Sequence, residues 1–406
     1  MNGENPYEKH LKARFEYADL VTFAQNKVTP RYNWFYYKEG YSRDFVWSAL
    51  KELSVQKGEL VVDPFCGTGT TLLAAKQAGY DCAGFDILPL GAFVSRVKLE
   101  DDYDVELIAE EIRRLTSVKF GQARTKLVDV GFIDMKRAFN QYARNDLPFF
   151  KERIMEVEDD KTRNLLLLGL LSIVGEASNV IKDGGVLKIV NKHRTPPVRH
   201  LLKNRLKRML KDLRDETNPN TKISWTVEQA DARQMPLEDG TADALITSPP
   251  YLNNVDYTKV YALELSLLIS SYKELEALRK KSMRSHISAV YEGQEGSEIV
   301  SRAMKHVTKT GGEVKVPPVV EGYLMDLYLS LKDAARVLKK GGCAAYVVGN
   351  TTLPGVTVDV DLMIAQMWED MGYTAEDIWV ANARWAQIHG VEKQRPVRES
   401  AVVLRK

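Results

Sequence analysis

The chain has 406 residues, of which 44% are hydrophobic and 28% are charged, and its formal net charge is +2. This length suits one large α/β domain with insertions or two domains, and the composition argues against an intrinsically disordered chain. Because the net charge is so small, any polyanionic partner has to be indicated by local clusters of Lys and Arg.

The sequence also argues against secretion, membrane insertion and metal binding. The first twenty residues, MNGENPYEKHLKARFEYADL, contain no signal-peptide core, and no apolar run reaches the about 18 residues that a membrane span needs. Cys66, Cys82 and Cys343 fit neither a disulfide framework nor a zinc spacing. We therefore expect a cytoplasmic protein with reduced thiols, no membrane partner and no metal site.

A β-α-β unit is predicted over residues 58–86. The apolar run LVVDPFC (60–66) has the character of a buried strand, a Gly-rich turn and the helix-forming stretch TTLLAAKQA (70–78) follow, and YDCAGFD (80–86) is a second strand. Gly79 stands where a helix commonly ends on glycine. The unit therefore predicts the front half of a doubly wound, parallel sheet.

The remaining chain divides into an insertion and the rest of this sheet. Long amphipathic and charged stretches predict a mostly helical insertion over 101–220, with helices at 105–118, 164–181 and 199–216. Strand patterns return at 223–231, 242–251, 343–350, 377–385 and 400–406, with a helix at 323–340. Residues 270–320, rich in Lys, Arg, Ser and Gly, are predicted to form a loop or a segment that is ordered only by a partner. The predicted catalytic domain thus comprises residues 1–100 and 221–406.

The first candidate site is the turn DPFCGTGTT (63–71). Its glycines allow a ligand to approach the backbone, and the following helix presents unpaired N–H groups at its start. A plain Gly-x-Gly turn between a strand and a helix has a purely structural alternative, but the full string is far more specific.

Two acids after later strands extend this site. Asp86 lies about 20 residues beyond the turn, where nucleotide-binding sheets place a carboxylate against ribose hydroxyls. Asp231, after the third strand, could accept from the amine of an adenine ring. The structural alternatives are a solvated turn residue for Asp86 and a helix or turn cap for Asp231.

The second candidate site is Thr247-Ser248-Pro249-Pro250-Tyr251, directly after the alternating strand ADALI. Two prolines cannot continue a strand ladder, so the chain must turn at the carboxyl edge of the sheet, where open α/β sheets bind ligands. The Ser248 hydroxyl and a backbone carbonyl can accept from an NH₂ group, and Tyr251 offers a ring on which a base can stack. A structural turn with an incidental tyrosine is the alternative.

With DPFCGTGTT, FDILPL, the acid of QADA and TSPPY in this order, the chain resembles the DNA amino-methyltransferases, which form N4-methylcytosine or N6-methyladenine. The resemblance covers roughly residues 30–100 and 221–406, and it includes NWFYYKEGYSRDF (33–45) as a looser match to an upstream cofactor motif. It implies a Rossmann-like, seven-stranded α/β methyltransferase sheet with one antiparallel strand. The cofactor motif precedes the catalytic motif, so the chain is not of the permuted type.

The resemblance also assigns roles to individual residues. It implies that S-adenosyl-L-methionine is held by the turn, by the end of the second strand and by the end of the third, at Asp63, Pro64, Phe65, Gly67, Thr68, Gly69, Thr70, Asp86, Ile87, Asp231 and Ala232. It implies that the catalytic residues are Ser248, Pro249, Pro250 and Tyr251.

The expected reaction is methylation of an exocyclic amine in double-stranded DNA, on a base flipped out of the helix. The Ser-Pro-Pro-Tyr form is more typical of the cytosine-N4 enzymes, and N6-adenine is the alternative target. The chain has no Pro-Cys dipeptide, which argues against methylation at cytosine C5 through a covalent thiol.

Candidate phosphate contacts lie in two basic segments within the insertion and the 270–320 region. They are Arg194, Arg199, Lys203, Arg205, Lys207 and Arg208 in the first segment and Lys280, Lys281 and Arg284 in the second. A solvated helix face is the alternative for both segments.

Two other functions stay open. Guanine-N2 methyltransferases of transfer RNA share a similar cofactor turn, but they carry Asp-Pro-Pro-Tyr and an N-terminal RNA-binding domain, for which residues 1–32 are too few. The other alternative is a non-catalytic module that binds nucleic acid or senses the cofactor. A cognate restriction or defence protein is a possible partner, and the sequence does not indicate an oligomeric state.

Overall fold

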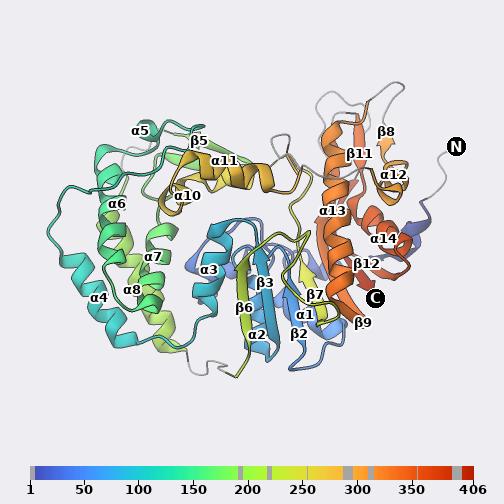
Figure 1. Ribbon diagram of the computed structural model, residues 1–406, viewed down its shortest axis with the longest axis horizontal. Helices are drawn as coiled ribbons and strands as arrows, with labels where there is room; N and C mark the ends of the chain where they lie inside the picture. The colour runs from blue at the N-terminus through green and yellow to red at the C-terminus, as the bar shows by residue number, and fades with distance from the viewer. Residues whose placement is uncertain are drawn as a thin grey trace.

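The computed structural model describes residues 5–190, 195–216, 222–253, 255–286, 296–309, 315–353, 355–385 and 396–406. Its centre is an eight-stranded sheet in the order β1-β12-β13-β9-β7-β2-β3-β6 (Figure 1). The strands are β1 (Leu11–Ala13), β2 (Leu60–Asp63), β3 (Asp81–Asp86), β6 (Trp225–Gln229), β7 (Ala242–Thr247), β9 (Leu338–Gly349), β12 (Thr374–Trp385) and β13 (Pro396–Arg405).

The strand directions confirm the predicted Rossmann-like arrangement. Strands β6, β3, β2, β7 and β9 pair in parallel, whereas β13 is antiparallel to both β9 and β12. These seven strands are the seven that the resemblance implies. The eighth, β1, has only three residues and pairs in parallel with the edge of β12, and it was not predicted.

The order of the strands fixes where a ligand can bind. From β2 the chain builds outward to β3 and β6, and it then returns to add β7 and β9 on the other side of β2. Loops after β2 and β7 therefore leave the sheet in opposite directions, which opens a crevice at the carboxyl ends of these two strands. Asp63 ends β2 and Thr247 ends β7, so both predicted motifs lie at this crevice.

Helices cover both faces of the sheet, and alternate strand residues pack against them. Val61 contributes to the core beneath one layer of helices, whereas its neighbour Val62 contributes to the core on the other face. The first layer consists of α1 (Arg43–Glu52), α2 (Thr70–Ala78) and α3 (Pro89–Leu99), and the second of α12 (Glu298–Met304), α13 (Pro318–Val337) and α14 (Val360–Asp370).

Residues before α1 form β1 and short turns of 3₁₀ helix, which pack against both layers of helices. Tyr17 and Tyr32 of this segment are buried in the core shared with α1 and α2. The turns are η1 (Pro6–His10), η2 (Phe15–Tyr17), η3 (Gln25–Lys27) and η4 (Tyr32–Trp34).

A helical lobe lies beside the sheet, at the left of Figure 1. Its elements are α4 (Val105–Ser117), α5 (Met135–Ala138), α6 (Gln141–Met155), α7 (Asp160–Ser172), β4 (Val180–Asp183), β5 (Val186–Ile189) and α8 (Val198–Asp215), followed much later in the chain by α9 (Tyr257–Val260), α10 (Ala262–Leu268) and α11 (Tyr272–Lys281). One hydrophobic core joins all the longer helices of the lobe to α3. The lobe is therefore larger than residues 101–220, because Leu263, Leu267 and Leu275 pack into it.

Two local predictions are wrong. The helix expected at 164–181 ends at Ser172, after which β4 and β5 form a hairpin. The loop expected at 270–320 contains α11, α12, the short strand β8 (Thr308–Lys309) and the start of α13. Strand β8 joins β10 (Thr351–Leu353) and β11 (Val356–Val358) in a small separate sheet.

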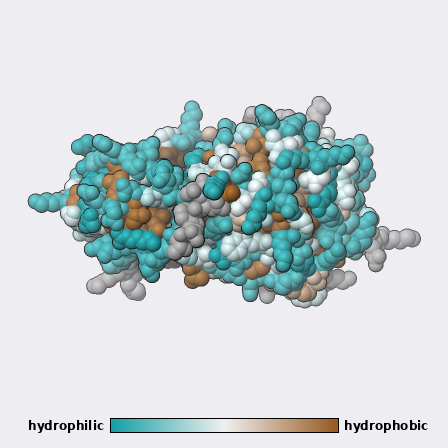
Figure 2. Space-filling model, turned by 90° about the horizontal axis from the view of Figure 1, so that it is seen from below, coloured by the Kyte–Doolittle hydropathy of each residue, from teal (hydrophilic) through white to brown (hydrophobic). Residues whose placement is uncertain are grey.

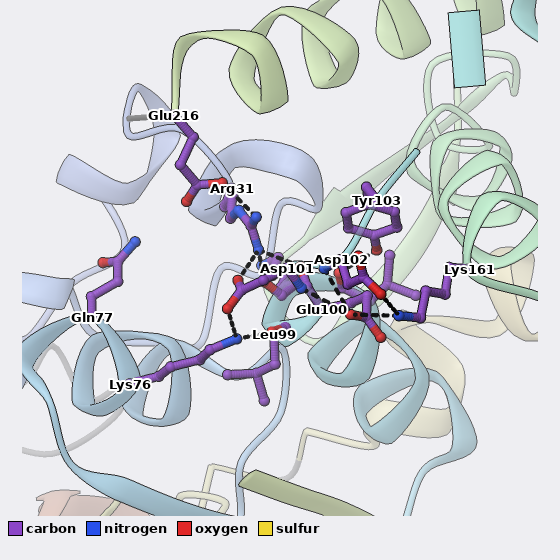
Figure 3. A network of polar contacts seen from close by, with 12 residues as sticks. Arg31, Lys76, Gln77, Leu99, Glu100, Asp101, Asp102, Tyr103, Lys161 and Glu216 are labelled. Carbon is purple, nitrogen blue, oxygen red and sulfur yellow. Dashed lines mark hydrogen bonds and ion pairs between the residues drawn. The ribbon is translucent and has the colours of Figure 1, made fainter. Parts of the chain in front are cut away.

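A buried ionic network fastens the helical lobe to the sheet (Figure 3). Arg31 donates to the carbonyls of Lys98 and Glu100, to Asp101 Oδ1 and, at 2.5 Å, to Glu216 Oε2. The second carboxylate oxygen of Asp101 lies 2.5 Å from the ammonium of Lys76, on α2. The network thus joins the N-terminal segment and α2 to the residues just after α3 and α8.

The surface seen in Figure 2 is mostly hydrophilic, and apolar side chains gather on it over the helical lobe. Phe120, Tyr142 and Met155 are among the exposed large apolar residues of that lobe. Within the described ranges, no helix is both long enough and apolar enough to cross a membrane.

Candidate active site

A cavity of about 420 Å³ opens at the carboxyl ends of β2, β3 and β7. Its wall combines residues from six parts of the chain: the segment before α1, the turns after β2, β3, β6 and β7, and the segment that follows α11. Tyr257 of α9, Asp326 of α13, Arg384 of β12 and Glu399 of β13 also line it. Both predicted motifs therefore face one cavity.

The Gly-rich turn forms a close backbone wall. Gly67 and Gly69 have φ angles of +49° and +77°, which favour glycine. A Cβ at Gly67 would lie 3.2 Å from the Tyr37 ring, and one at Gly69 would lie 2.8 Å from the Ser95 hydroxyl on α3. Helix α2 starts at Thr70 without a side-chain cap, so its first N–H groups are left for a ligand.

Asp86 is fixed by the backbone of this turn. Its Oδ2 accepts from Gly67 N–H at 2.9 Å, and its Oδ1 accepts from Leu88 N–H at 2.7 Å. Burial raises the pKa of Asp86 to about 6, and the two backbone donors act against that rise. Each carboxylate oxygen still has a lone pair for a further donor, so the side chain can accept hydroxyl groups from the cavity.

Asp63 physically joins the two motifs. One of its oxygens accepts from Thr247 Oγ1, at the end of β7, and the other accepts from Thr71 Oγ1, on α2, each at 2.6 Å. Tyr41 contacts Thr71 at 2.5 Å and donates to the Ile246 carbonyl at 3.2 Å. Burial raises the pKa of Asp63 to about 6, against the effect of its hydrogen-bond donors. Asp63 thus holds the shape of the site.

The turn after β7 presents its four residues to the cavity. Ser248, Pro249, Pro250 and Tyr251 all line it. The Tyr251 ring lies against Gly349 of β9, where a Cβ would be 2.9 Å from the ring carbon Cδ2. Its hydroxyl donates to Glu399 Oε1 at 3.1 Å. Glycine at 349 therefore makes room for the ring, and Glu399 fixes its orientation.

Asp231 lies at the cavity but is already paired. Both of its oxygens accept from the Arg233 guanidinium, at 2.9 and 2.6 Å. Arg233 in turn binds Asp326 on α13, whose side chain is fully buried. Asp231 itself is 37% exposed, so it can accept another donor while Arg233 holds it in place.

Of the fifteen residues predicted for the cofactor and catalytic sites, fourteen line this cavity. They are Asp63, Pro64, Phe65, Gly67, Thr68, Thr70, Asp86, Ile87, Asp231, Ala232, Ser248, Pro249, Pro250 and Tyr251. Gly69 does not line it, because the turn directs this residue against α3.

Several cavity residues were not predicted. Tyr37, Glu39 and Tyr41 fall in the looser upstream match, which gave no individual roles. His286 and Glu399 had no local signal, since the first follows a basic stretch and the second lies within an ordinary strand pattern.

The predicted phosphate contacts divide into two groups. Arg199 stacks on Phe120 at 3.8 Å, Arg205 binds Glu176, and Arg284 binds Asp326. These three guanidinium groups have internal partners, which weakens their assignment to DNA. The side chains that stay exposed are Lys203, Lys207, Arg208, Lys280 and Lys281. Arg194 lies outside the described residues.

In the part of the chain that the structure describes, no cluster of three or more His, Cys, Asp or Glu side chains is arranged to hold a metal ion. All three cysteines are buried, and burial raises the pKa of the Cys82 thiol to about 12.

Sequence comparison finds relatives along nearly the whole chain. The profile of the DNA methylase family matches residues 9–89. The chain is 28% identical to the type II methyltransferase M.BsoBI of Geobacillus stearothermophilus over 451 residues, covering 95% of this chain and 86% of that protein. It is 25% identical to M.AvaI of Nostoc sp. over 432 residues, covering 95% and 89%.

Among solved structures, a SAM-dependent methyltransferase from Aquifex aeolicus is similar with 10% identity and a TM-score of 0.26, covering 88% of this chain and 89% of that one. At so low a TM-score the fold assignment depends on the strand order of this chain itself.

Proposed function

We propose that this chain, a member of the DNA amino-methyltransferases, transfers a methyl group from S-adenosyl-L-methionine to the N4 amino group of cytosine in double-stranded DNA. The observation that carries the proposal is that the Gly-rich turn and the Ser248–Tyr251 turn line the same cavity. A methyl donor on one wall and an amine on the other would meet there. Thr247 and Thr71 both donate to Asp63, and these two hydrogen bonds hold the two walls in a fixed position relative to each other.

The residues present fit S-adenosyl-L-methionine. The backbone around Gly67 leaves little room for a side chain and leaves N–H groups at the start of α2, which suits the polar methionine part. In this proposal Asp86 would accept from ribose hydroxyls and Asp231 from an adenine amine. When bound, the cofactor supplies a methyl group that its sulfonium charge has already activated.

The protein's task is then to prepare the amine. The lone pair of an aryl amine is delocalised into the ring, so it is a poor nucleophile. Hydrogen bonds from the NH₂ group to Ser248 Oγ and to the Pro249 carbonyl would localise that pair on nitrogen and align it with the methyl group. The Tyr251 ring, supported by Gly349, would stack on the flipped base.

Serine as the first residue of the catalytic turn favours cytosine N4 over adenine N6. Both bases present an amine next to a ring nitrogen, so the same turn serves either reaction. N6-adenine is therefore the second candidate.

We assign DNA recognition to the helical lobe, including residues 101–220, and to the segment around α11. Their exposed cations are Lys203, Lys207, Arg208, Lys280 and Lys281. In Figure 1, α11 lies on the upper side of the lobe, and the chain that follows it reaches the cavity at Ser282–His286. Because M.BsoBI and M.AvaI are type II methyltransferases, we infer that this chain protects DNA within a restriction or defence system.

The test is methylation of PCR-amplified genomic DNA, which carries no modified bases, followed by nucleoside digestion and mass spectrometry. N4-methyldeoxycytidine is the expected product, and Ser248→Ala should reduce it at least a hundredfold. N6-methyldeoxyadenosine would keep the reaction and change the base. Methylation of total transfer RNA alone, or of neither nucleic acid, would refute the proposal.

A further inference from the structure

Glu399 is an acid in the catalytic cavity that no motif predicts. It lies near the start of β13, one of the last strands in the chain, opposite Gly349 of β9 and Asn382 of β12. Its side chain is partly buried and lines the cavity. The Tyr251 hydroxyl donates to its Oε1 at 3.1 Å. A carboxylate of the C-terminal strand thus reaches the catalytic turn after β7.

The hydrogen bonds around Tyr251 form a directed chain. Burial raises the pKa of Tyr251 well above its usual value, and a hydrogen bond with the Ser248 hydroxyl acts against that rise. The Tyr251 hydroxyl uses its own hydrogen to bond Glu399. When the Ser248 hydroxyl donates to Tyr251, the lone pairs of Ser248 Oγ remain free to accept from a donor in the cavity. Each group in this chain accepts from the one before it.

We infer that Glu399 is the final acceptor of the proton that the target amine loses, and that Ser248 and Tyr251 carry the proton to it. The inference rests on the proposed function, since it requires an amine at Ser248. It adds to that function a positioning residue outside the catalytic turn, and it gives the Tyr251 hydroxyl a task beyond the stacking of its ring.

The proton balance is closed within these groups. As nitrogen gains the methyl group, one amine N–H bond breaks and its proton passes to Ser248 Oγ. The proton of Ser248 passes to the Tyr251 oxygen, and the proton of Tyr251 passes to Glu399. Both hydroxyl groups are regenerated, and the neutral Glu399 returns its proton to water after product release. No other acceptor is needed.

The charge around Glu399 sets the pH at which it can accept. Burial raises the pKa of Glu399, while the Tyr251 hydroxyl and the positive charge of Arg384, on β12, lower it. Gly349 and Asn382, its neighbours across the strands, carry no charge. Because only the ionised carboxylate accepts a proton, the methylation rate should rise with pH through this raised pKa and then level off.

The experiment compares Glu399→Gln, Tyr251→Phe and the double variant with the wild-type chain. The substrate is PCR-amplified genomic DNA, the methyl donor is tritiated S-adenosyl-L-methionine at saturation, and the rate is measured from pH 5 to pH 9. The amide oxygen that Glu399→Gln introduces can still accept from the Tyr251 hydroxyl, so the ring should stay in place. Glu376→Gln is the matched control, because Glu376 is an exposed acid of β12 that binds Arg405 outside the cavity.

Loss of a general base typically lowers a rate by about 10²-fold or more. We therefore expect Glu399→Gln to be about a hundredfold slower at pH 8 and to lack the rise at acidic pH. Tyr251→Phe should show the same loss, and the double variant should lose no more, because the two groups act in one chain. Binding of S-adenosylhomocysteine, measured by calorimetry, should not change, and Glu376→Gln should match the wild type throughout.

Wild-type rate and pH profile in Glu399→Gln would overturn the inference while leaving the proposed function intact. If Glu399→Gln does not fold, Tyr251→Phe decides, because it removes one oxygen atom only; an unchanged pH profile in that variant would overturn the inference. A wild-type chain that methylates no DNA at all would refute the proposed function and the inference together.

Discussion

Removal of the Arg31 side chain should uncouple the helical lobe from the sheet. The guanidinium is 4% exposed and makes four hydrogen bonds, two to backbone carbonyls and two to the carboxylates of Asp101 and Glu216. Breaking a buried ion pair by removing one partner costs about 3–5 kcal/mol. Asp101 would keep Lys76, and Glu216 is 25% exposed and can regain water. We therefore expect Arg31→Met to lower the free energy of unfolding by about 3 kcal/mol, at the lower end of that range.

The assay is urea denaturation followed by circular dichroism, with Lys161→Met as the control. Lys161 belongs to the same network (Figure 3), where it binds Glu100 and Asp102, but its side chain is 38% exposed. Exposed pairs contribute about 0–1 kcal/mol, so this variant should change the free energy of unfolding by less than about 1 kcal/mol. Equal effects of the two substitutions, or a change of less than about 1 kcal/mol for Arg31→Met, would refute the reasoning.

Three further predictions concern the cavity and the DNA. Gly349→Ala should place a methyl group 2.9 Å from the Tyr251 ring and slow methylation at least tenfold, while calorimetry should show unchanged S-adenosylhomocysteine binding; an active variant would contradict the packing. Burial raises the pKa of Asp86 to about 6, so the charged form is lost as the pH falls through 6, and the affinity for the cofactor should fall with it. Asp86→Asn should bind the cofactor about tenfold more weakly at pH 7.5, which corresponds to about 1.5 kcal/mol for a charged hydrogen bond. The affinity of this variant should not depend on pH in that range. Lys203→Ala combined with Lys207→Ala should reduce the slope of log affinity for duplex DNA against log salt concentration by about 2; an unchanged slope would mean that this face of α8 does not contact phosphates.

The sequence predicts the sheet well because its signals are local. A strand, a glycine turn and a helix follow one another within residues 58–86, and the structure confirms them as β2, α2 and β3. The antiparallel β13 could be anticipated only from the resemblance, because no residue in SAVVLRK records its direction. Strand β1 could not be predicted, because its three residues gain their pairing from β12, more than 360 positions away.

The helical lobe shows where local patterns fail. Residues 165–174 are apolar apart from Ser172, so periodicity could not indicate that α7 ends at Ser172 and that β4 begins at Val180. Polar residues around α11 predicted a loop, yet Leu275 and Leu278 provide the apolar face that docks this helix on the lobe. The sequence around Arg284 could not indicate that this side chain pairs inside the protein, because its partner Asp326 lies 42 residues later and is fully buried.

The difference between local patterns and contacts distant in sequence also explains which cavity residues could be predicted. Motif residues lie in the two turns that the strand order brings together, so a string of letters was enough to identify them. Glu399 and Tyr41 act on those turns from the two ends of the chain, through single hydrogen bonds to Tyr251 and Ile246. Contacts of that kind leave no periodic pattern, because one acid in a strand or one tyrosine in a loop is ordinary by itself.

The helical lobe and the cofactor turn share a packed boundary. Tyr261, just before α10, stacks on Tyr37 with ring centroids 4.9 Å apart, and its hydroxyl donates to Glu39 at 2.6 Å. Tyr37 in turn covers Gly67, where a Cβ would lie only 3.2 Å from its ring. A shift of α10 therefore has to move Tyr37, and with it the wall of the cavity, unless the aromatic stack breaks. The insertions that form the lobe leave the sheet after α3 and after β7, so two connections hold the lobe against the Gly-rich turn.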